Sequence, residues 1–351
     1  MITEKPSARL STGAIAADPR LEQIQHWIKS DLSIRNSQLE AASADASFRR
    51  YFRLLSDSRS WVIMDAPPEK EDCLSFVKVA RLIEAVGVQA PHIYSFNEAQ
   101  GFMQLSDLGS VAFLDELVRS ESAEDQQASA DILYADAIRA LVKMQSIQAE
   151  LPAYNETLLH TEMALFKDWY LNRHLHLHLD DIQQSVLENA FNVLAESALL
   201  QTTVFVHRDY HSRNLMVTDS NNPGVIDFQD AVNGPASYDL VSLIKDCYIA
   251  WPRNRQLQWV DQYLELSNVA LNRDVFIRQF DLMGLQRHLK AIGIFARLKH
   301  RDAKSGYLKD IPRTLAYVVD VCSRYEELDE FLKLLLQLGL RAEPELLAAI
   351  Q

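Results

Sequence analysis

The segment from residue 204 to residue 230 restricts what this chain can fold into and do more than any other part of the sequence. An apolar run ends in His207-Arg-Asp209, and Asn214 follows five residues after that Asp. A second apolar run then leads to Asp227, thirteen residues after the Asn. Short apolar runs of this kind are typical of buried strands, so we expect the polar residues to lie in loops held between short strands.

This spacing is typical of enzymes that transfer phosphoryl groups. Such enzymes need one carboxylate near the attacking hydroxyl and an oxygen-rich pair that holds Mg²⁺ on the nucleotide phosphates. A kinase catalytic loop followed by a metal-binding Asp supplies these groups at nearly the same separations. We therefore predict Asp209 as the catalytic, base-like residue, and Asn214 and Asp227 as the Mg²⁺ ligands.

Other interpretations of the same residues stay open at this stage. His207 is expected to support the loop rather than to act chemically, and His211 to contact the substrate or to brace the loop. A rival hypothesis takes the two histidines with Asp209 and Asp227 as the two-metal cluster of a hydrolase. That hypothesis leaves Asn214 without a role.

The composition limits the class of protein. The chain of 351 residues is long enough for one large domain or two lobes. Its net charge of −13 argues against a nucleic-acid-binding protein, although a local cation and Mg²⁺ would still allow a nucleotide to bind. The sequence contains no apolar run of about 18 residues, so we expect no membrane-spanning helix. Residues 1–20 lack the apolar core of a signal peptide. Three widely spaced cysteines suit a reducing compartment, so we expect a cytoplasmic protein.

The pattern of apolar residues predicts an α+β protein with two lobes. After a loose tail over 1–20 we expect an N-lobe over 21–105 and a C-lobe over 106–351. The N-lobe elements in order are a helix over 21–29, a β-hairpin region over 37–65, a helix over 72–86, and strands over 92–96 and 101–105. The C-lobe helices are expected over 111–119, 126–147, 158–175, 182–200, 237–249, 256–269, 274–300 and 311–337.

The central motif resembles that of the aminoglycoside phosphotransferase and choline kinase family. His207-x-Asp209-x-His211-x-x-Asn214 is similar to the family's His-Gly-Asp-x-His-x-x-Asn, with Arg208 in place of the Gly. Asp227-Phe-Gln-Asp is similar to its metal motif, and the resemblance extends over about residues 25–310. It implies a two-lobed protein kinase-like fold, with a small β-rich N-lobe that binds the nucleotide and a larger, mostly helical C-lobe.

A narrower resemblance covers five further segments. They are similar to a subgroup, the bacterial anomeric sugar kinases: Ala46–Arg53, Val62–Pro68, Ser106–Gly109, Phe166–Tyr170 and Arg287–Arg297. These kinases phosphorylate N-acetylmuramate and N-acetylglucosamine at the C1 hydroxyl in peptidoglycan recycling. The resemblance implies ATP and Mg²⁺ as cofactors, a sugar α-1-phosphate as product, and a downstream nucleotidyltransferase that makes a UDP-sugar. It implies no nucleic-acid or membrane partner.

The nucleotide side departs from the general kinase pattern. No Gly-x-Gly-x-x-Gly is present, and Ser43–Ser47 is the expected phosphate turn. Met64 lies near the position where a phosphate-binding Lys is expected, so Arg49 or Arg50 would supply the cation. Successive strand residues face opposite sides of a sheet, so only one of the two arginines would reach the phosphates. In the alternative interpretation, both are surface arginines. The backbone of the segment that ends at Leu105 would bind adenine.

The candidate substrate contacts lie in the C-lobe. They are His211, Arg213, Asp230 and Trp169. Aromatic rings stack on sugar faces, but Trp169 on a helix is also a typical core position. Four basic residues share one helical face and would either receive the lactyl carboxylate of N-acetylmuramate or form a solvated face or an ion-pair network: Arg287, Lys290, Arg297 and Arg301.

The length of the segment after the metal motif favours a small acceptor over a peptide. A helix is expected to begin near Ser237, ten residues after Asp227, which leaves little room for a peptide-docking platform. Another small alcohol, such as an aminoglycoside, choline or homoserine, stays open as the acceptor. Because the N-lobe Lys is missing, a non-catalytic pseudokinase stays open too. The sequence leaves open the anomer, the preferred sugar, ATP against GTP, and the oligomeric state.

Overall fold

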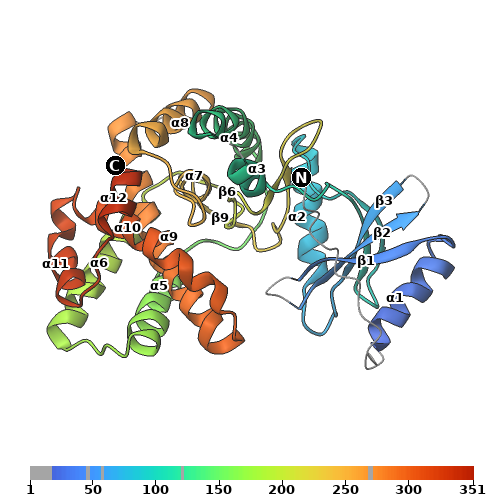
Figure 1. Cartoon of the computed structure of the whole chain (residues 1–351), viewed down its shortest axis with the longest axis horizontal. Coiled ribbons are helices and arrows are strands. Elements are labelled where there is room, and N and C mark those ends of the chain that lie inside the picture. The colour runs from blue at the N-terminus through green and yellow to red at the C-terminus, as the bar shows by residue number, and fades with distance from the viewer. Residues whose placement is uncertain (1–17, 45–47, 57–58, 120–121, 268–271) are drawn as a thin grey trace. The chain divides into compact units, whose positions relative to one another are not determined.

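The computed structural model describes residues 18–44, 48–56, 59–119, 122–267 and 272–351 (Figure 1). Most of the expected N-terminal tail and of the expected phosphate turn therefore lies outside the described residues. The chain forms two compact units. The first contains the described residues up to Cys73 together with His92–Asp107, and the second contains Leu74–Pro91 and Leu108–Gln351.

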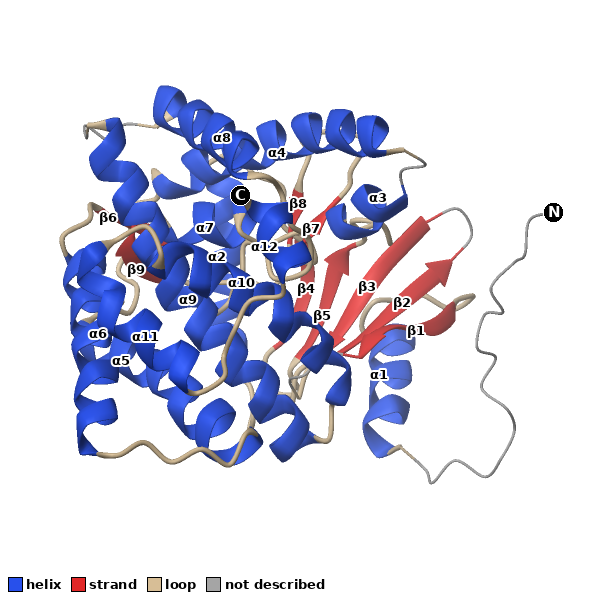
Figure 2. Cartoon of the chain, turned by 60° about the vertical axis from the view of Figure 1, so that its left-hand side comes forward, coloured by secondary structure: helices blue, strands red, loops and turns tan. Residues whose placement is uncertain are grey.

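The first unit is a five-stranded antiparallel sheet with one helix (Figure 2). The strand order is β1-β2-β3-β5-β4. The elements of this unit are α1 (Pro19–Ser30), β1 (Gln38–Ala44), β2 (Arg50–Ser56), β3 (Arg59–Asp65), β4 (Ile93–Asn97) and β5 (Phe102–Ser106).

Helix α1 covers one face of this sheet. It begins where the Asp18 side chain accepts hydrogen bonds from the backbone N–H groups of residues 20 and 21, and Pro19 stands in its first turn. Its buried side chains form one core cluster with three side chains of the sheet: Ile24, Trp27, Ile28, Leu54, Ile63 and Phe102. Strand alternation therefore places Met64, the neighbour of Ile63, on the opposite face.

The sheet has one more strand than the sequence predicts. The region over 37–65 was expected to be a hairpin, but β1 pairs with β2 as a third strand. Its sequence, Gln-Leu-Glu-Ala-Ala-Ser-Ala, is poor in β-branched and aromatic residues. Intrinsic strand preference is weak in comparison with backbone pairing to a neighbouring strand, so this edge strand forms without the usual pattern.

The second unit is mainly helical. Its helices are α2 (Cys73–Ala85), α3 (Phe113–Arg119), α4 (Ala123–Gln145), α5 (Glu156–Leu165), the π-helix η1 (Phe166–His174), α6 (Asp181–Leu199), α7 (Tyr238–Ile244), α8 (Arg253–Leu266), α9 (Arg273–Asp302), the 3₁₀-helices η2 (Ser305–Asp310) and η3 (Glu326–Leu328), α10 (Ile311–Cys322), α11 (Asp329–Gln337) and α12 (Pro344–Ile350). No helix among the described residues combines the length and the apolar character needed to cross a membrane.

Two short antiparallel pairs hold the motif segment of this unit. Strand β6 (Thr203–Val206) pairs with β9 (Val232–Pro235), and β7 (Leu215–Met216) pairs with β8 (Gly224–Val225). The motif residues follow β6, precede β7 and follow β8. The sequence prediction of loops between short strands is confirmed here.

Helix α9 is the centre of the second unit (orange in Figure 1). It packs against α5, α6, α7, α10 and η1, and both its apolar and several of its polar side chains are buried. One close approach is at Gly293, where an added Cβ atom would lie 2.4 Å from the carbonyl carbon of Leu165. This contact lies at the point where α5 ends and η1 begins.

Three predicted helices end or break earlier than expected. The helix over 158–175 changes to a π-helix at Phe166. The helix over 237–249 ends at Ile244, and the next residues form a loop because Asp246 bonds to the backbone of Ser212. The helix over 311–337 breaks after Cys322, and the Tyr325 side chain in the break bonds to Asp281 of α9. Tertiary contacts of this kind need no Gly or Pro at the end of the helix, so the sequence pattern does not reveal these helix ends.

We predict that Gly293→Ala weakens the packing of α9. Ala raises helix propensity by about 1 kcal/mol, but the methyl group meets backbone atoms that cannot move aside, so we expect a net loss of about 1–3 kcal/mol. Denaturant unfolding measures this loss. Gly306→Ala is the matched control because an added Cβ there meets no atom within 4 Å. Equal midpoints for the two variants would contradict the close approach.

Candidate active site

His207 supports the motif loop from inside. The side chain is fully buried; its Nε2 donates to the Ile226 carbonyl over 3.1 Å, and its Nδ1 accepts from the Asp209 backbone N–H over 3.2 Å. Burial lowers the pKa of His207 to about 4, so the ring is neutral near pH 7. Both ring nitrogens are therefore occupied by the backbone, as the supporting role requires.

Arg208 holds a backbone conformation that normally suits Gly. Its φ is +79°, at the position where the resemblance expects Gly. Two carboxylates stabilise it. The Arg208 guanidinium pairs with Glu162 of α5 at 2.5 Å, and Asp239 of α7 accepts the backbone N–H groups of His207 and Arg208 at 2.6 and 3.0 Å. Burial raises the pKa of Asp239 to about 7, and the two N–H donors oppose that rise.

Asp209 is held in its ionised form. Burial by itself would raise the pKa of this carboxyl, but Lys290, His211 and Arg287 outweigh burial and lower the pKa below its ordinary value. An ionised carboxylate is the form that accepts a proton from a hydroxyl group. The structure thus supplies the charge state that the predicted catalytic role needs.

Asn214 and Asp227 face each other next to Asp209. The Asn214 Nδ2 donates to the Asp209 carbonyl over 3.0 Å and lies 3.4 Å from the Asp227 Oδ2. Because the amide nitrogen is used in this way, Oδ1 is the atom that Asn214 would offer to a cation. Together with the Asp227 carboxylate it gives the oxygen donors that Mg²⁺ prefers, so the pair fits this metal.

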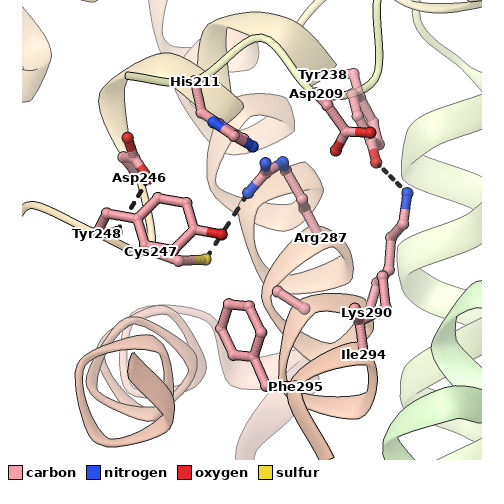
Figure 3. Close-up of a pocket in the computed structure, with 11 residues that line it drawn as sticks. Asp209, His211, Tyr238, Asp246, Cys247, Tyr248, Arg287, Lys290, Ile294 and Phe295 are labelled. Carbon is pink, nitrogen blue, oxygen red and sulfur yellow. Dashed lines mark hydrogen bonds between the residues drawn. The ribbon is translucent and has the colours of Figure 1, made fainter. Parts of the chain in front are cut away.

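A cavity of about 90 Å³ opens beside Asp209 (Figure 3). Its walls come from the motif loop, from α7 and the loop after it, and from α9. The lining residues are Asp209, His211, Tyr238, Asp246, Cys247, Tyr248, Arg287, Lys290, Ala291, Ile294 and Phe295.

The predicted basic face divides into two parts. Arg287 and Lys290 are buried at the cavity, so the interpretation of a solvated face is wrong for them. Lys290 pairs with Glu162 at 2.9 Å and donates to the Tyr238 hydroxyl over 2.9 Å. Farther along α9, Arg301 is exposed and pairs with the adjacent Asp302.

Only one of the four candidate substrate contacts lies at the cavity. His211 lines it, with its ring edge toward the Tyr248 ring and its Nδ1 without a hydrogen-bond partner in the structure. Arg213 is exposed and lies over the Tyr248 ring at 4.7 Å. Asp230 is exposed, and Trp169 is half-buried on η1. None of these three lines the cavity.

The four candidate nucleotide contacts lie in the first unit. Arg50 is on the same face as α1, where it pairs with Asp18 and, at 2.5 Å, with Asp65. Met64 and Leu105 are on the opposite face, since Met64 lies two residues from Val62, the partner of Leu105 in the sheet. Arg49 precedes β2, and its Nε lies 3.6 Å from Glu71.

The cavity residues that were not recognised from the sequence include three consecutive ones. Asp246, Cys247 and Tyr248 were expected in a helix, but they form the loop after α7. Glu162 of α5 was missed as well. The motif itself gave no indication of these four residues, because the loop over 246–248 and Glu162 both lie outside the motif segment.

A model of the phosphotransferase enzyme family matches residues 38–274. The chain belongs to this family. The phosphotransferase is 43% identical over 344 residues to the N-acetylmuramate/N-acetylglucosamine kinase of Pseudomonas putida, covering 93% of this chain and 99% of the relative. It is 39% identical over 324 residues to the protein of the same name in Neisseria meningitidis serogroup B, covering 90% and 95%. The predicted resemblance is confirmed, and the hydrolase hypothesis is wrong.

Solved structures establish the fold. An aminoglycoside phosphotransferase bound to ADP gives a TM-score of 0.56 at 16% identity, covering 86% of this chain and 98% of that one. The choline kinase of Streptococcus pneumoniae gives a TM-score of 0.61 at 10% identity, covering 86% and 100%. The predicted α+β, two-lobed protein kinase-like fold is therefore confirmed for the phosphotransferase.

We predict that His207 makes the phosphotransferase sensitive to acid. Between about pH 6.5 and pH 4 the unfolded chain binds a proton at this position and the folded chain does not. The free energy of unfolding therefore falls as the pH is lowered through this range, by about 3 kcal/mol in total.

Unfolding curves at pH 7, 6, 5 and 4 measure this fall for the native protein and for His207→Gln. The Gln amide can still donate to the Ile226 carbonyl but does not titrate, so we expect a shallower fall. Parallel curves for the two proteins would contradict a neutral, buried His207.

Proposed function

We propose that this phosphotransferase transfers a phosphoryl group from ATP to the anomeric C1 hydroxyl of N-acetylmuramate and N-acetylglucosamine. The observation that carries the proposal is the ionised Asp209 at the wall of a cavity, beside an Asn–Asp pair suited to Mg²⁺. The choice of acceptor rests on the names of the relatives at 43% and 39% identity.

The chain's own groups carry the acceptor chemistry. Asp209 accepts the hydrogen of the C1 hydroxyl and orients its oxygen toward the γ-phosphorus. As the new C1–O–P bond forms, the bond between the γ-phosphorus and the bridging oxygen breaks, ADP leaves, and the proton passes to Asp209. Asn214 and Asp227 would hold Mg²⁺, which when bound neutralises charge on the nucleotide phosphates.

The cavity suits a neutral or anionic sugar better than a cationic acceptor. Two buried cations line it; Lys290 is paired with Glu162, but Arg287 has no carboxylate partner among the described residues and repels the ammonium groups of an aminoglycoside or of choline. The rings of Tyr248 and Phe295 give it apolar surfaces that suit the C–H faces of a sugar. This argument favours an N-acetylated sugar over the other small alcohols.

The nucleotide contacts are assigned to the first unit. Arg49, held by Glu71, resembles the Lys–Glu pair of kinases and would supply the cation for the phosphates. Arg50 lies on the other face of the sheet in a pair of carboxylates, so it is a less suitable candidate. In this proposal residues 21–105 bind ATP, and residues 106–351 carry catalysis and acceptor binding.

The product class suggests a place in metabolism. A sugar 1-phosphate is the substrate class from which a nucleotidyltransferase makes a UDP-sugar. We therefore place the reaction in cytoplasmic peptidoglycan recycling, with such an enzyme downstream.

We predict ADP release with N-acetylmuramate and N-acetylglucosamine in the presence of Mg-ATP, and an anomeric phosphate in the phosphorus NMR spectrum of the product. Glucose, kanamycin and choline complete the panel. Asp209→Asn should lower kcat by about 10²–10⁴ while ATP still binds, because only the proton acceptor is lost.

The outcomes separate the alternatives. Turnover only with kanamycin or choline would keep the residue roles and discard the sugar. ATP binding without turnover of any acceptor would favour the pseudokinase. Near-normal turnover in Asp209→Asn would contradict the catalytic role.

We predict different effects for the two adjacent arginines of the first unit. Arg49→Gln should raise KM for ATP about tenfold or more, because a charge-assisted contact to phosphate is lost. Arg50→Gln should leave KM for ATP nearly unchanged and lower the unfolding midpoint, because Asp18 and Asp65 lose a partner. Steady-state kinetics and thermal unfolding of both variants test the assignment, and the reverse pattern would overturn it.

A further inference from the structure

Arg287 is an exception among the buried cations of the structure. Within the described residues, three lysine and arginine side chains are buried: Lys245, Lys290 and Arg287. Lys245 pairs with Asp281 at 2.7 Å, and Lys290 pairs with Glu162 at 2.9 Å. The described residues place no carboxylate within 4.0 Å of the Arg287 guanidinium, although this side chain is only 6% exposed.

The acids nearest to Arg287 in the cavity have other partners. Asp246 uses Oδ2 for the Ser212 backbone N–H and hydroxyl, and Oδ1 for the Tyr248 backbone N–H. Asp209 belongs to the reacting groups. The one hydrogen bond of the Arg287 guanidinium in the structure goes to the Cys247 sulfur over 3.9 Å, and its Nε has no partner.

This arrangement is suited to an anionic ligand. An unpaired buried charge is costly, and a planar guanidinium matches a carboxylate through two parallel hydrogen bonds. Figure 3 shows the guanidinium reaching from α9 toward His211, in the cavity that Asp209 also lines. A ligand in this cavity would therefore meet the free donors of Arg287 and the catalytic carboxylate together.

We propose that Arg287 binds the lactyl carboxylate of N-acetylmuramate and so determines the preference for an acidic over a neutral amino sugar. This inference rests on the proposed function, since it takes the acceptor to be one of these two sugars. The two differ in the lactyl ether at O3, whose carboxylate is the only anionic group on either molecule. Of the two members of the basic face that line the cavity, Arg287 is the one without a carboxylate partner among the described residues.

The transferred phosphoryl group is the other anion in the reaction that a buried cation could bind, and the structure favours the carboxylate for Arg287. The metal pair, Asn214 and Asp227, does not line this cavity, whereas Tyr248, Phe295 and Ile294 do. The surroundings of Arg287 are therefore those of an acceptor site. Loss of a phosphoryl contact would impair both sugars equally, and loss of a carboxylate contact would impair one.

The test compares kcat/KM for the two sugars in native protein, Arg287→Gln and Arg287→Lys. For Arg287→Gln we expect the ratio of kcat/KM for N-acetylmuramate to kcat/KM for N-acetylglucosamine to fall about tenfold to a hundredfold, mainly through KM for N-acetylmuramate. Any loss that both sugars share through the effect of Arg287 on Asp209 cancels in this ratio. Arg287→Lys should restore part of the ratio because it keeps the charge without the planar fork. Arg301→Gln is the matched control on the same helix, exposed and paired with Asp302, and should leave the ratio unchanged.

A second measurement needs no variant and so does not depend on folding. The methyl ester of N-acetylmuramate keeps the lactyl group but removes its charge, and with native protein it should lose the same preference over N-acetylglucosamine. Equal kcat/KM for ester and acid, or an equal loss for both sugars in Arg287→Gln, would overturn the inference. Failure of native protein to phosphorylate either sugar would instead overturn the proposed function, and the inference with it.

Discussion

The arrangement of the catalytic loop depends on one buried carboxylate, that of Glu162. It pairs with Arg208 of the loop and with Lys290 of α9, and it accepts a hydrogen bond from the Tyr154 hydroxyl. Burial would raise the pKa of Glu162, but the two cations lower it, so the carboxylate stays ionised. Removing one partner of such a cluster leaves an uncompensated buried charge, which costs about 3–5 kcal/mol. Glu162 thereby connects α5, the loop and α9, and it allows a side-chain-bearing residue to keep the left-handed conformation at position 208.

The charged side chains around the cavity have different roles because they have different hydrogen-bond and ion-pair partners. Lys290 is neutralised by Glu162 and still lowers the pKa of Asp209. Arg287 has no such partner among the described residues, and the proposed contact with a ligand carboxylate rests on this difference. Both carboxylate oxygens of Asp246 accept hydrogen bonds from the backbone N–H groups of residues 212 and 248. Asp246 therefore holds the cavity wall in place instead of neutralising the cations. A chain with a negative net charge thus contains a cavity lined by two buried cations, and the net charge alone does not predict this local positive charge.

The sequence predicted the parts of the site that lie close together along the chain. Asp209, Asn214 and Asp227 fall in one segment between apolar runs, and the structure brings them together. The prediction was weaker where contacts between residues far apart in the sequence determine the position of a side chain. Arg49 and Arg50 are adjacent and chemically alike, yet Asp65 and Asp18 draw Arg50 to the α1 face. Trp169 and Asp230 were chosen by motif, and neither lines the cavity, because a motif does not record which side of an element faces the site.

The sequence by itself indicated the class of chemistry and the α+β order of elements, because these depend on local spacing and on the period of apolar residues, and its motifs carried the resemblance to the family. The tertiary structure alone decided which charges are neutralised. Arg287 and Lys290 lie three residues apart on one helix, and nothing in the order of residues separates them. Glu162, more than a hundred residues earlier, reaches Lys290 and leaves Arg287 without a carboxylate partner among the described residues. Electrostatic pairing depends on distance in space and on burial, and only the fold sets both.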